Sequence, residues 1–285
     1  MDFSQTLIRC SAIGLIMTEP KGYITEKQLE TLKKLEEKGN LTDKQREEYL
    51  TLVAKRAEVE YLPLSDTAQG HLLEVFVYKM WGKRIKPALD NNKYLMKGKL
   101  VENDSIALVS FLDEKLYEKN DERLNNEWLT GEPDLFDGEL LIKADKVIDV
   151  KSSWDLSTYW DAVLDGLKKV WWWQMQGYLA LTNCQAGEIH ICLVSTPEVL
   201  VNDEKRRLFH KMDCVTEEDP AYKAAAANLE FNMRFDDIPP DQRRFIYTVE
   251  RDDAAIEQIY RRVEKCRKWL QSYQSTYEVA FRKNQ

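Results

Sequence analysis

The stretch from Leu129 to Trp154 constrains the fold most, because two apolar runs in it each contain an acidic residue. The second run carries Val147, Ile148 and Val150, whose β-branched side chains are typical of a buried strand. A polar break at residues 143–146 precedes this run and favours a turn. We therefore expect two antiparallel strands joined as a hairpin.

Three polar residues of this hairpin form a candidate site. Asp149 and Lys151 lie two positions apart on the second strand, so that their side chains point to the same face of the sheet. Asp134 comes from the neighbouring run, and antiparallel pairing would bring it close to Asp149. Two carboxylates beside a lysine are typical of a hard-cation site with a positive charge at its edge. Because charged residues make up 32% of the chain, a solvated strand face is the open alternative.

Length and composition bound the class of protein. The 285 residues, 44% of them hydrophobic, are enough for one large domain or for a core with an appendage. No apolar run approaches the ~18 residues that span a bilayer, and residues 1–17 lack the pattern of a secretory signal. We expect a globular cytoplasmic protein that does not interact with a membrane.

The five cysteines are an odd number at irregular spacing, without a CxxC pair. This pattern argues against a disulfide framework and against a zinc site. We expect reduced thiols that are mostly buried.

Although the net charge of the chain is −8, one segment of it is basic. Between residues 79 and 99 there is one acid, Asp90, and there are seven cations: Lys79, Lys83, Arg84, Lys86, Lys93, Lys97 and Lys99. Such a segment suits binding to the phosphates of a nucleic acid, with Lys83, Arg84 and Lys86 as the candidate contacts. A merely solvated face is the alternative.

The first part of the chain predicts a helical appendage. Thr25 and Thr42 each precede an amphipathic stretch, at residues 25–38 and 42–61, and each is suited to cap a helix. We expect a helical hairpin, within an appendage of residues 1–63 that precedes a core of residues 64–285. The apolar segment at residues 9–17 predicts a short docked helix.

Two further helices carry polar residues that need partners. In the helix expected at residues 65–81, Gly70 lies one turn before Glu74 and leaves its carboxylate approachable. In the helix expected at residues 168–181, Gln174 and Tyr178 share one face. A buried amide without a partner costs roughly 1–3 kcal/mol, so we expect a polar site beside this helix.

The remaining chain predicts strands at residues 188–195 and 245–250, and a long helix from residue 252 onward. His190 is expected to be structural. Residues 197–240 read as charged and irregular, with a helical piece at residues 224–227.

Taken in chain order, four motifs resemble those of the lambda-exonuclease or RecB-like (YqaJ-like) branch of the PD-(D/E)XK nuclease superfamily. They are Gly70-x-x-x-Glu74, Pro133-Asp134, Asp149-x-Lys151 and Gln174-x-x-x-Tyr178. The resemblance implies an α/β (α+β) restriction-endonuclease-like core, in which helices flank a central mixed β-sheet. The aromatic-rich sequence after Asp149 is also similar to that of phage-encoded members.

The resemblance implies a metal-dependent DNA exonuclease that acts in recombination, repair or phage DNA processing. Asp134, Asp149, the Val150 carbonyl and Glu74 would hold Mg²⁺ or Mn²⁺. Lys151 would orient or deprotonate the attacking water and stabilise the transition state, while Gln174 would position the phosphate or the lysine. Tyr178 would support this helix face.

Other implied features concern DNA and partners. Arg9 and Ser11 resemble residues near the DNA end and are candidates for a terminal phosphate, and Ser152 and Ser153 are further candidates for the DNA site. A homo-oligomer and a single-strand annealing or other recombination protein are the implied partners. Some relatives hold an iron-sulfur cluster, but the wide separation of Cys184, Cys192 and Cys214 does not predict one here.

Two alternatives stay open. An endonuclease of the same superfamily, such as a resolvase or a restriction-like enzyme, would carry the same metal site. A non-catalytic DNA-binding subunit would share the fold but lack the activity. A carboxylate cluster is, however, costly to hold without a cation.

Overall fold

The computed structural model describes residues 2–58, 63–85 and 92–282. By contacts within the chain, one compact unit contains residues 1–4, 15–83 and 261–285, and the second contains residues 5–14 and 84–260. Each unit is described by itself below. The boundary that the sequence predicts between an appendage and a core, at residues 63 and 64, stays a prediction.

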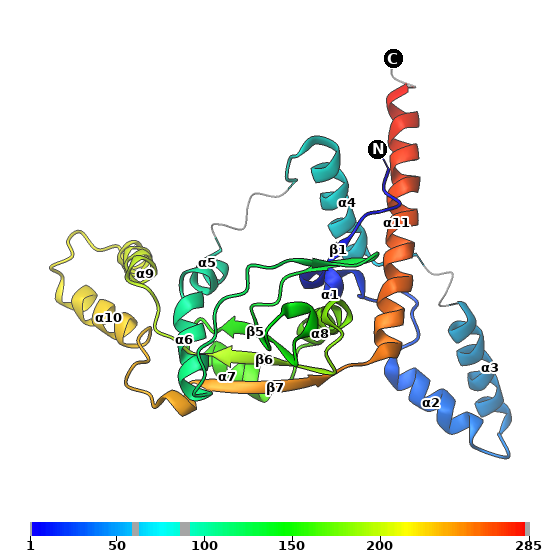
Figure 1. Cartoon of the computed structure of the whole chain (residues 1–285), viewed down its shortest axis with the longest axis horizontal. Helices are drawn as coiled ribbons and strands as arrows, with labels where there is room; N and C mark the ends of the chain where they lie inside the picture. Colours follow the sequence, from blue (N-terminus) through cyan, green and yellow to red (C-terminus); the bar gives the residue numbers. More distant parts are fainter. Residues whose placement is uncertain (1, 59–62, 86–91, 283–285) are drawn as a thin grey trace. The chain divides into compact units, whose positions relative to one another are not determined.

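A four-stranded mixed sheet forms the centre of the second unit, as predicted (Figure 1). Its strands follow the order β4 (Leu135–Asp137), β5 (Lys146–Ser152), β6 (Ala186–Cys192) and β7 (Arg244–Glu250). The central pair, β5 and β6, is parallel, and the two outer pairs are antiparallel. The three longer strands are those that the alternating sequence patterns predict.

The expected hairpin is the pair β4 and β5. Leu135 lies opposite Ile148, and the Asp145 N–H donates to the Asp137 carbonyl where the connection closes. The connection contains the 3-10 helix η4 (Leu141–Lys143), whose Leu141 is buried, and Gly138 with a φ of 131°. This φ is one that glycine adopts readily and other residues do not.

Helices cover the two faces of this sheet. On one face, α6 (Glu102–Leu112) packs its Val109 and Ile106 against Leu135 and Ile148 in the core. On the other face, the α8 (Lys169–Thr182) side chain of Met175 reaches Gly187 of β6, where a Cβ atom would clash with it. Because side chains alternate along β5, Asp149 and Lys151 lie on the face that α8 covers.

Several further helices belong to this unit. Residues 93–112 form α5 (Lys93–Leu100) and α6, and α7 (Leu156–Leu164) starts at the capping residue Asp155. The prediction of an irregular segment at residues 197–240 is wrong for most of its length, since it holds α9 (Glu198–Lys211) and α10 (Pro220–Phe231), and the 3-10 helix η5 (Pro240–Gln242) follows. The helical piece predicted at residues 224–227 lies within α10 and is confirmed. Phe209 and Tyr222 pack edge to face at 5.2 Å, so that α9 and α10 stabilise each other.

The second unit also has a small sheet of β1 (Ile8–Arg9), β3 (Leu129–Gly131) and β2 (Leu124–Asn125), in the order β1-β3-β2. The single helix expected at residues 9–17 is therefore wrong at its start. Ile8 and Arg9 pair with β3 in parallel, which keeps their backbone extended, and the chain then turns through η1 (Cys10–Ala12) into α1 (Ile13–Ile16).

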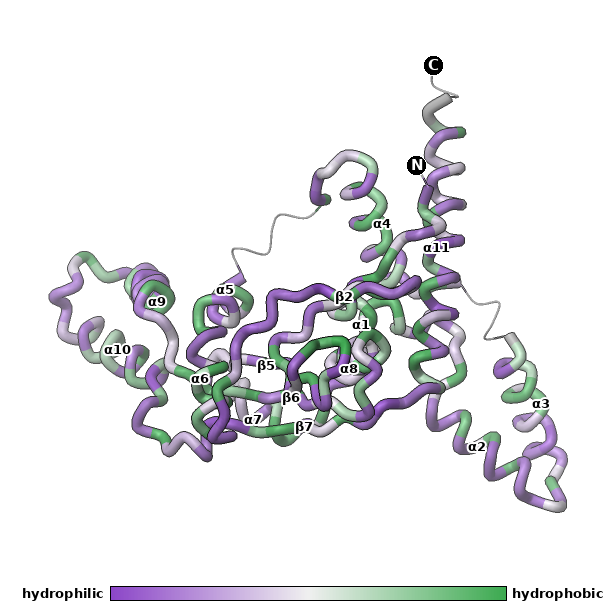
Figure 2. The backbone as a smooth tube through the Cα atoms, in the orientation of Figure 1, coloured by the Kyte–Doolittle hydropathy of each residue, from purple (hydrophilic) through white to green (hydrophobic). Residues whose placement is uncertain are grey.

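The first unit is helical and contains the predicted hairpin. Thr25 caps α2 (Glu26–Glu36) with a capping box, and α3 (Asp43–Glu58) follows. Leu32 and Leu35 of α2 pack with Leu52 of α3 around Ile24. Hydrophobic and hydrophilic segments alternate along both helices, as expected for one apolar stripe (Figure 2).

Ser65 caps α4 (Asp66–Trp81), also as predicted. The long α11 (Asp253–Arg282) begins among the residues of the second unit and continues into the first. Among the helices that the structure describes, none combines the length and the hydrophobicity needed to cross a bilayer.

Candidate active site

Asp149 is the centre of a polar cluster between β5 and α8. Its side chain is buried, and the residue is 2% exposed. Its Oδ1 accepts a hydrogen bond of 3.0 Å from Gln174 Nε2, and its Oδ2 lies 2.5 Å from Lys151 Nζ as an ion pair. Among the described residues, no hydrogen-bond donor is aligned with that second oxygen. The same-face placement of Asp149 and Lys151 that the sequence predicts is confirmed.

Gln174 joins this cluster to α8. Its Nε2 donates to Tyr178 Oη at 2.9 Å, one turn along the helix, as well as to Asp149. Lys151 Nζ donates to Gln174 Oε1 at 3.4 Å. The half-buried amide of Gln174 therefore finds its partners in the polar site, as expected. The other glutamine of the helix, Gln176, instead bonds the Glu250 carbonyl and the Asp252 N–H at the end of β7.

Asp134 reaches the cluster from the connection between β3 and β4. Its Oδ2 accepts a 2.6 Å hydrogen bond from the Val150 N–H, which ties it to β5 beside Asp149. Asn120 holds this connection, because its backbone N–H donates to the Asp134 carbonyl and its Nδ2 donates to the Pro133 carbonyl. Asn120 is buried, and sequence analysis missed it because a single asparagine carries no periodic signal.

The two carboxylates influence each other electrostatically. Burial and, after it, the negative charge of Asp149 raise the pKa of Asp134 to about 7. Burial alone would lower the pKa of Lys151, but the charge of Asp149, its direct contact with Lys151 and the charge of Asp134 together outweigh burial and raise that pKa above its ordinary value. Burial and Asp149 also raise the pKa of Tyr178 well above its ordinary value. Lys151 thus stays cationic near neutral pH, and Tyr178 stays neutral.

These residues suit a hard cation. The donor set consists of oxygens, and the negative charge of Asp149 lies beside the carboxyl group of Asp134, whose pKa is raised by burial and then by this charge. Within residues 2–58, 63–85 and 92–282, no three His, Cys, Asp or Glu side chains converge to hold a metal ion. A cation here would therefore bind the pair Asp134 and Asp149 together with other oxygens, such as the predicted Val150 carbonyl.

A small pocket of about 120 Å³ adjoins the cluster through Tyr178. Arg9 and Ser11, the candidates for a terminal phosphate, both line it. Arg123, which sequence analysis missed, lines the same pocket and forms an ion pair with Glu132. No motif surrounds Arg123 in the sequence. Arg123 comes close to Arg9 because β2 and β1 both pair with β3.

The serines after Lys151 have partners in the fold. Ser152 Oγ lies 2.8 Å from Ser105 Oγ of α6, on the face of the sheet opposite to Asp149. Ser153 is buried, and its N–H donates to the Cys192 carbonyl. These contacts fix the end of β5, and a direct role of Ser152 and Ser153 in DNA binding stays a prediction.

Two other predicted site residues, Glu74 and Lys83, belong to the first unit, and Arg84 belongs to the second. Glu74 is half-buried on α4, and Lys83 and Arg84 are exposed just after this helix. Lys86 lies outside the described residues. The structure thus brings together Asp134, Asp149, Lys151, Gln174 and Tyr178, and the participation of Glu74 stays a prediction.

Comparisons with known proteins find likeness at the level of structure. No family model and no curated protein sequence matches the chain. A phage-related exonuclease from Haemophilus somnus 129PT superposes with a TM-score of 0.64 at 24% identity, over 96% of this chain and 97% of that one. The alkaline exonuclease LHK-Exo from Laribacter hongkongensis superposes with a TM-score of 0.56 at 13% identity, over 99% of this chain and 96% of that one.

A third structure, LHK-Exo in complex with dAMP, gives a TM-score of 0.51 at 15% identity, over 78% of this chain and 88% of that one. At these identities the likeness shows a shared fold. The chain thus has the α/β fold of these exonucleases, and the first two superpositions cover nearly all of its length.

Proposed function

We propose that this protein is a metal-dependent DNA exonuclease of the PD-(D/E)XK type. The observation that carries the proposal is the cluster of Asp134, Asp149, Lys151 and Gln174 between β5 and α8. A buried carboxylate pair, a paired lysine and an orienting amide are the groups that phosphodiester hydrolysis needs. The fold shared with exonucleases supports the same assignment.

Asp134 and Asp149 are the proposed side-chain ligands of Mg²⁺ or Mn²⁺, with the Val150 carbonyl and Glu74 as further ligands. When bound, the ion supplies a water of lowered pKa and neutralises charge on the phosphate. The negative charge of Asp149, which adds to burial in raising the pKa of Asp134, supports this assignment.

Lys151 has an electrostatic role in this proposal. Since Asp149 keeps the pKa of Lys151 raised, the ammonium group donates hydrogen bonds and stabilises negative charge on the phosphate, in preference to accepting a proton from water. Gln174 holds Lys151 and Asp149 at a fixed separation, and Tyr178 holds Gln174. Both are therefore positioning residues in this account.

The pocket of Arg9, Ser11 and Arg123 supports action at a DNA end. Its volume of about 120 Å³ suits one phosphate group, and it meets the cluster at Tyr178. The guanidinium of Arg9 and the hydroxyl of Ser11 would bind a terminal phosphate. We further propose a phage or prophage source, work in the host cytoplasm, a homo-oligomer and a recombination partner such as a single-strand annealing protein.

A comparison of linear and covalently closed circular duplex DNA tests this function. With Mg²⁺ or Mn²⁺ the protein should degrade linear duplex and leave closed circles intact, and EDTA should stop the reaction. Equal cutting of both forms would contradict the exonuclease assignment and favour an endonuclease. No cutting with either metal would contradict hydrolysis altogether.

A further inference from the structure

The carboxyl end of α4 presents two exposed aromatic side chains. Tyr78 is 57% exposed and Trp81 is 47% exposed. They lie three positions apart, which places them on one face of the helix. The Gly82 N–H bonds the Tyr78 carbonyl at 2.7 Å, and Gly82 ends the helix with a φ of 66°, so that the chain leaves the helix directly beside these rings.

Trp81 is held rigidly although it is exposed. Its ring meets the buried Phe76 edge to face at 6.0 Å, and it meets Tyr277 of α11 at 5.6 Å. Phe76 is itself stacked on Phe3 at 5.4 Å. All of these residues belong to the first unit. A ring fixed in this way loses little conformational entropy when a ligand stacks on it.

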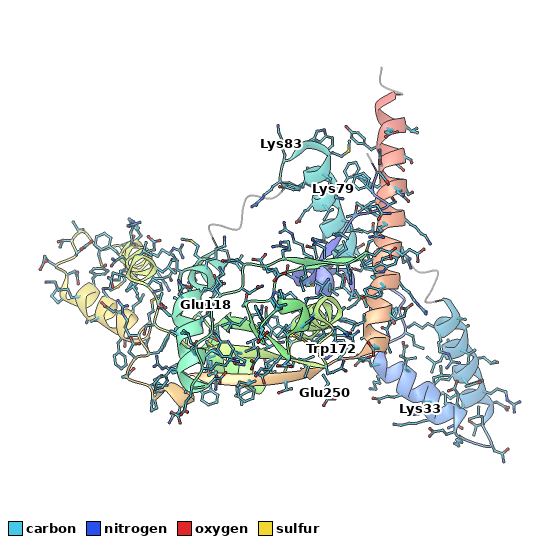
Figure 3. The ribbon with its side chains drawn as sticks, in the orientation of Figure 1. Lys33, Lys79, Lys83, Glu118, Trp172 and Glu250 are labelled. Atoms are coloured by element: carbon cyan, nitrogen blue, oxygen red, sulfur yellow. The ribbon has the colours of Figure 1, made fainter. Side chains whose placement is uncertain are left out.

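Positive charge follows the two rings. Lys83 comes directly after Gly82 and is exposed (Figure 3). No acidic residue occurs between Val75 and Ile85 in the sequence. The preceding cation, Lys79, lies 5.9 Å from the Phe3 ring and so already packs within the unit. The exposed surface at this end of the helix therefore combines two aromatic rings with the cation of Lys83.

We propose that Tyr78, Trp81 and Lys83 form a binding site for single-stranded nucleic acid. Cations bind the phosphates of either a single strand or a duplex, but an exposed ring needs the uncovered face of a base, which each base of a single strand can offer. In a duplex those faces are covered by neighbouring base pairs. The proposal deepens the proposed function, because degradation of one strand of a duplex leaves the other single-stranded.

The test measures affinity rather than cleavage, so it does not depend on the nuclease assignment. A fluorescein-labelled oligothymidine of about twenty nucleotides and a matched hairpin duplex serve as probes in EDTA. We compare the full-length protein with Tyr78→Ala and with Trp81→Leu, which keeps an apolar group against Phe76. Phe231→Ala is the control, since Phe231 is a 69% exposed aromatic residue on α10, beside Glu230.

We expect the Kd for oligothymidine to rise about fivefold or more in Tyr78→Ala and in Trp81→Leu, with duplex affinity and the Phe231→Ala control unchanged. Replacing Lys83 with alanine should flatten the salt dependence of single-strand binding by about 0.7 units of log–log slope. An unchanged Kd in both aromatic variants overturns the proposal. An equal loss for duplex overturns the preference for single strands.

Linear-duplex cleavage in Mg²⁺, measured in parallel, separates the two claims. Cleavage without aromatic-dependent binding would leave the proposed function in place and remove this site. Aromatic-dependent binding without cleavage would support this site and remove the nuclease assignment.

Discussion

Lys97 of α5 is buried completely, with 0% of the residue exposed, and replacing it with methionine should change how stability depends on pH. Its Nζ donates to the Trp154 carbonyl at 2.8 Å and lies 5.2 Å from the Phe235 ring. Burial lowers the pKa of Lys97 from 10.5 to about 7, and Asp155 opposes this only in part. Lys93 Nζ also lies near the Trp154 ring, at 4.8 Å, and adds no negative charge.

The sign of the effect follows from the two pKa values. The folded chain releases the Lys97 proton near pH 7, whereas the unfolded chain keeps it up to about pH 10.5, so the unfolded state binds more protons in this window. Stability from this group therefore rises with pH between about 7 and 10.5. The slope approaches 1.4 kcal/mol per pH unit, which amounts to about 2 kcal/mol between pH 7 and pH 9.

Urea unfolding followed by circular dichroism at pH 7, 8 and 9 measures this difference. The wild type should gain about 2 kcal/mol relative to Lys97→Met across that range. The matched control is Lys99→Met, because Lys99 is exposed on the same helix, and its profile should stay parallel to that of the wild type. If the free energy of unfolding depended on pH in the same way in Lys97→Met and in the wild type, the interpretation of Lys97 as a buried, easily deprotonated lysine would be refuted.

Three further predictions concern the candidate site. Gly177→Ala should destabilise the protein by about 1–3 kcal/mol in urea unfolding, because its Cβ would overlap the Ile13 side chain, and an unchanged midpoint would contradict this packing. Arg9→Ala should abolish any preference for 5′-phosphorylated over 5′-hydroxyl linear duplex while cleavage continues, and a preference that persists would remove Arg9 from the end-binding pocket. Gln174→Met should lower kcat more than it changes KM, because it releases Asp149 and Lys151 from their common partner, and wild-type kcat would show that this amide is dispensable.

Local patterns were sufficient for the elements that carry the candidate site. Alternation identified β5, and four-residue spacing placed Gln174 and Tyr178 on one face of α8. Period-two geometry also placed Asp149 beside Lys151. Each of these placements concerns residues that are close in sequence. A few backbone dihedral angles therefore determine which side chains share a face.

Contacts between distant residues escaped the sequence analysis. Arg123 reaches the pocket of Arg9 only through the pairing of β2 and β1 with β3, and Asn120 acts through backbone groups of Pro133 and Asp134. The helix α9 was missed, and α10 was predicted only at residues 224–227, because both helices depend on contacts with each other, such as that between Phe209 and Tyr222. Arg9 was assigned to a helix because its pairing with β3 involves residues about 120 positions away.

Asp149→Asn tests the central claim most directly, because it removes one negative charge from the carboxylate pair without creating a cavity. The measurement is the rate at which wild type and variant degrade a 5′-phosphorylated, end-labelled linear duplex in Mg²⁺, with circular dichroism confirming that the variant is folded. The account predicts that the folded variant does not degrade the duplex. Degradation at the wild-type rate would remove Asp149 from the mechanism and contradict the assignment of this cluster as a nuclease site.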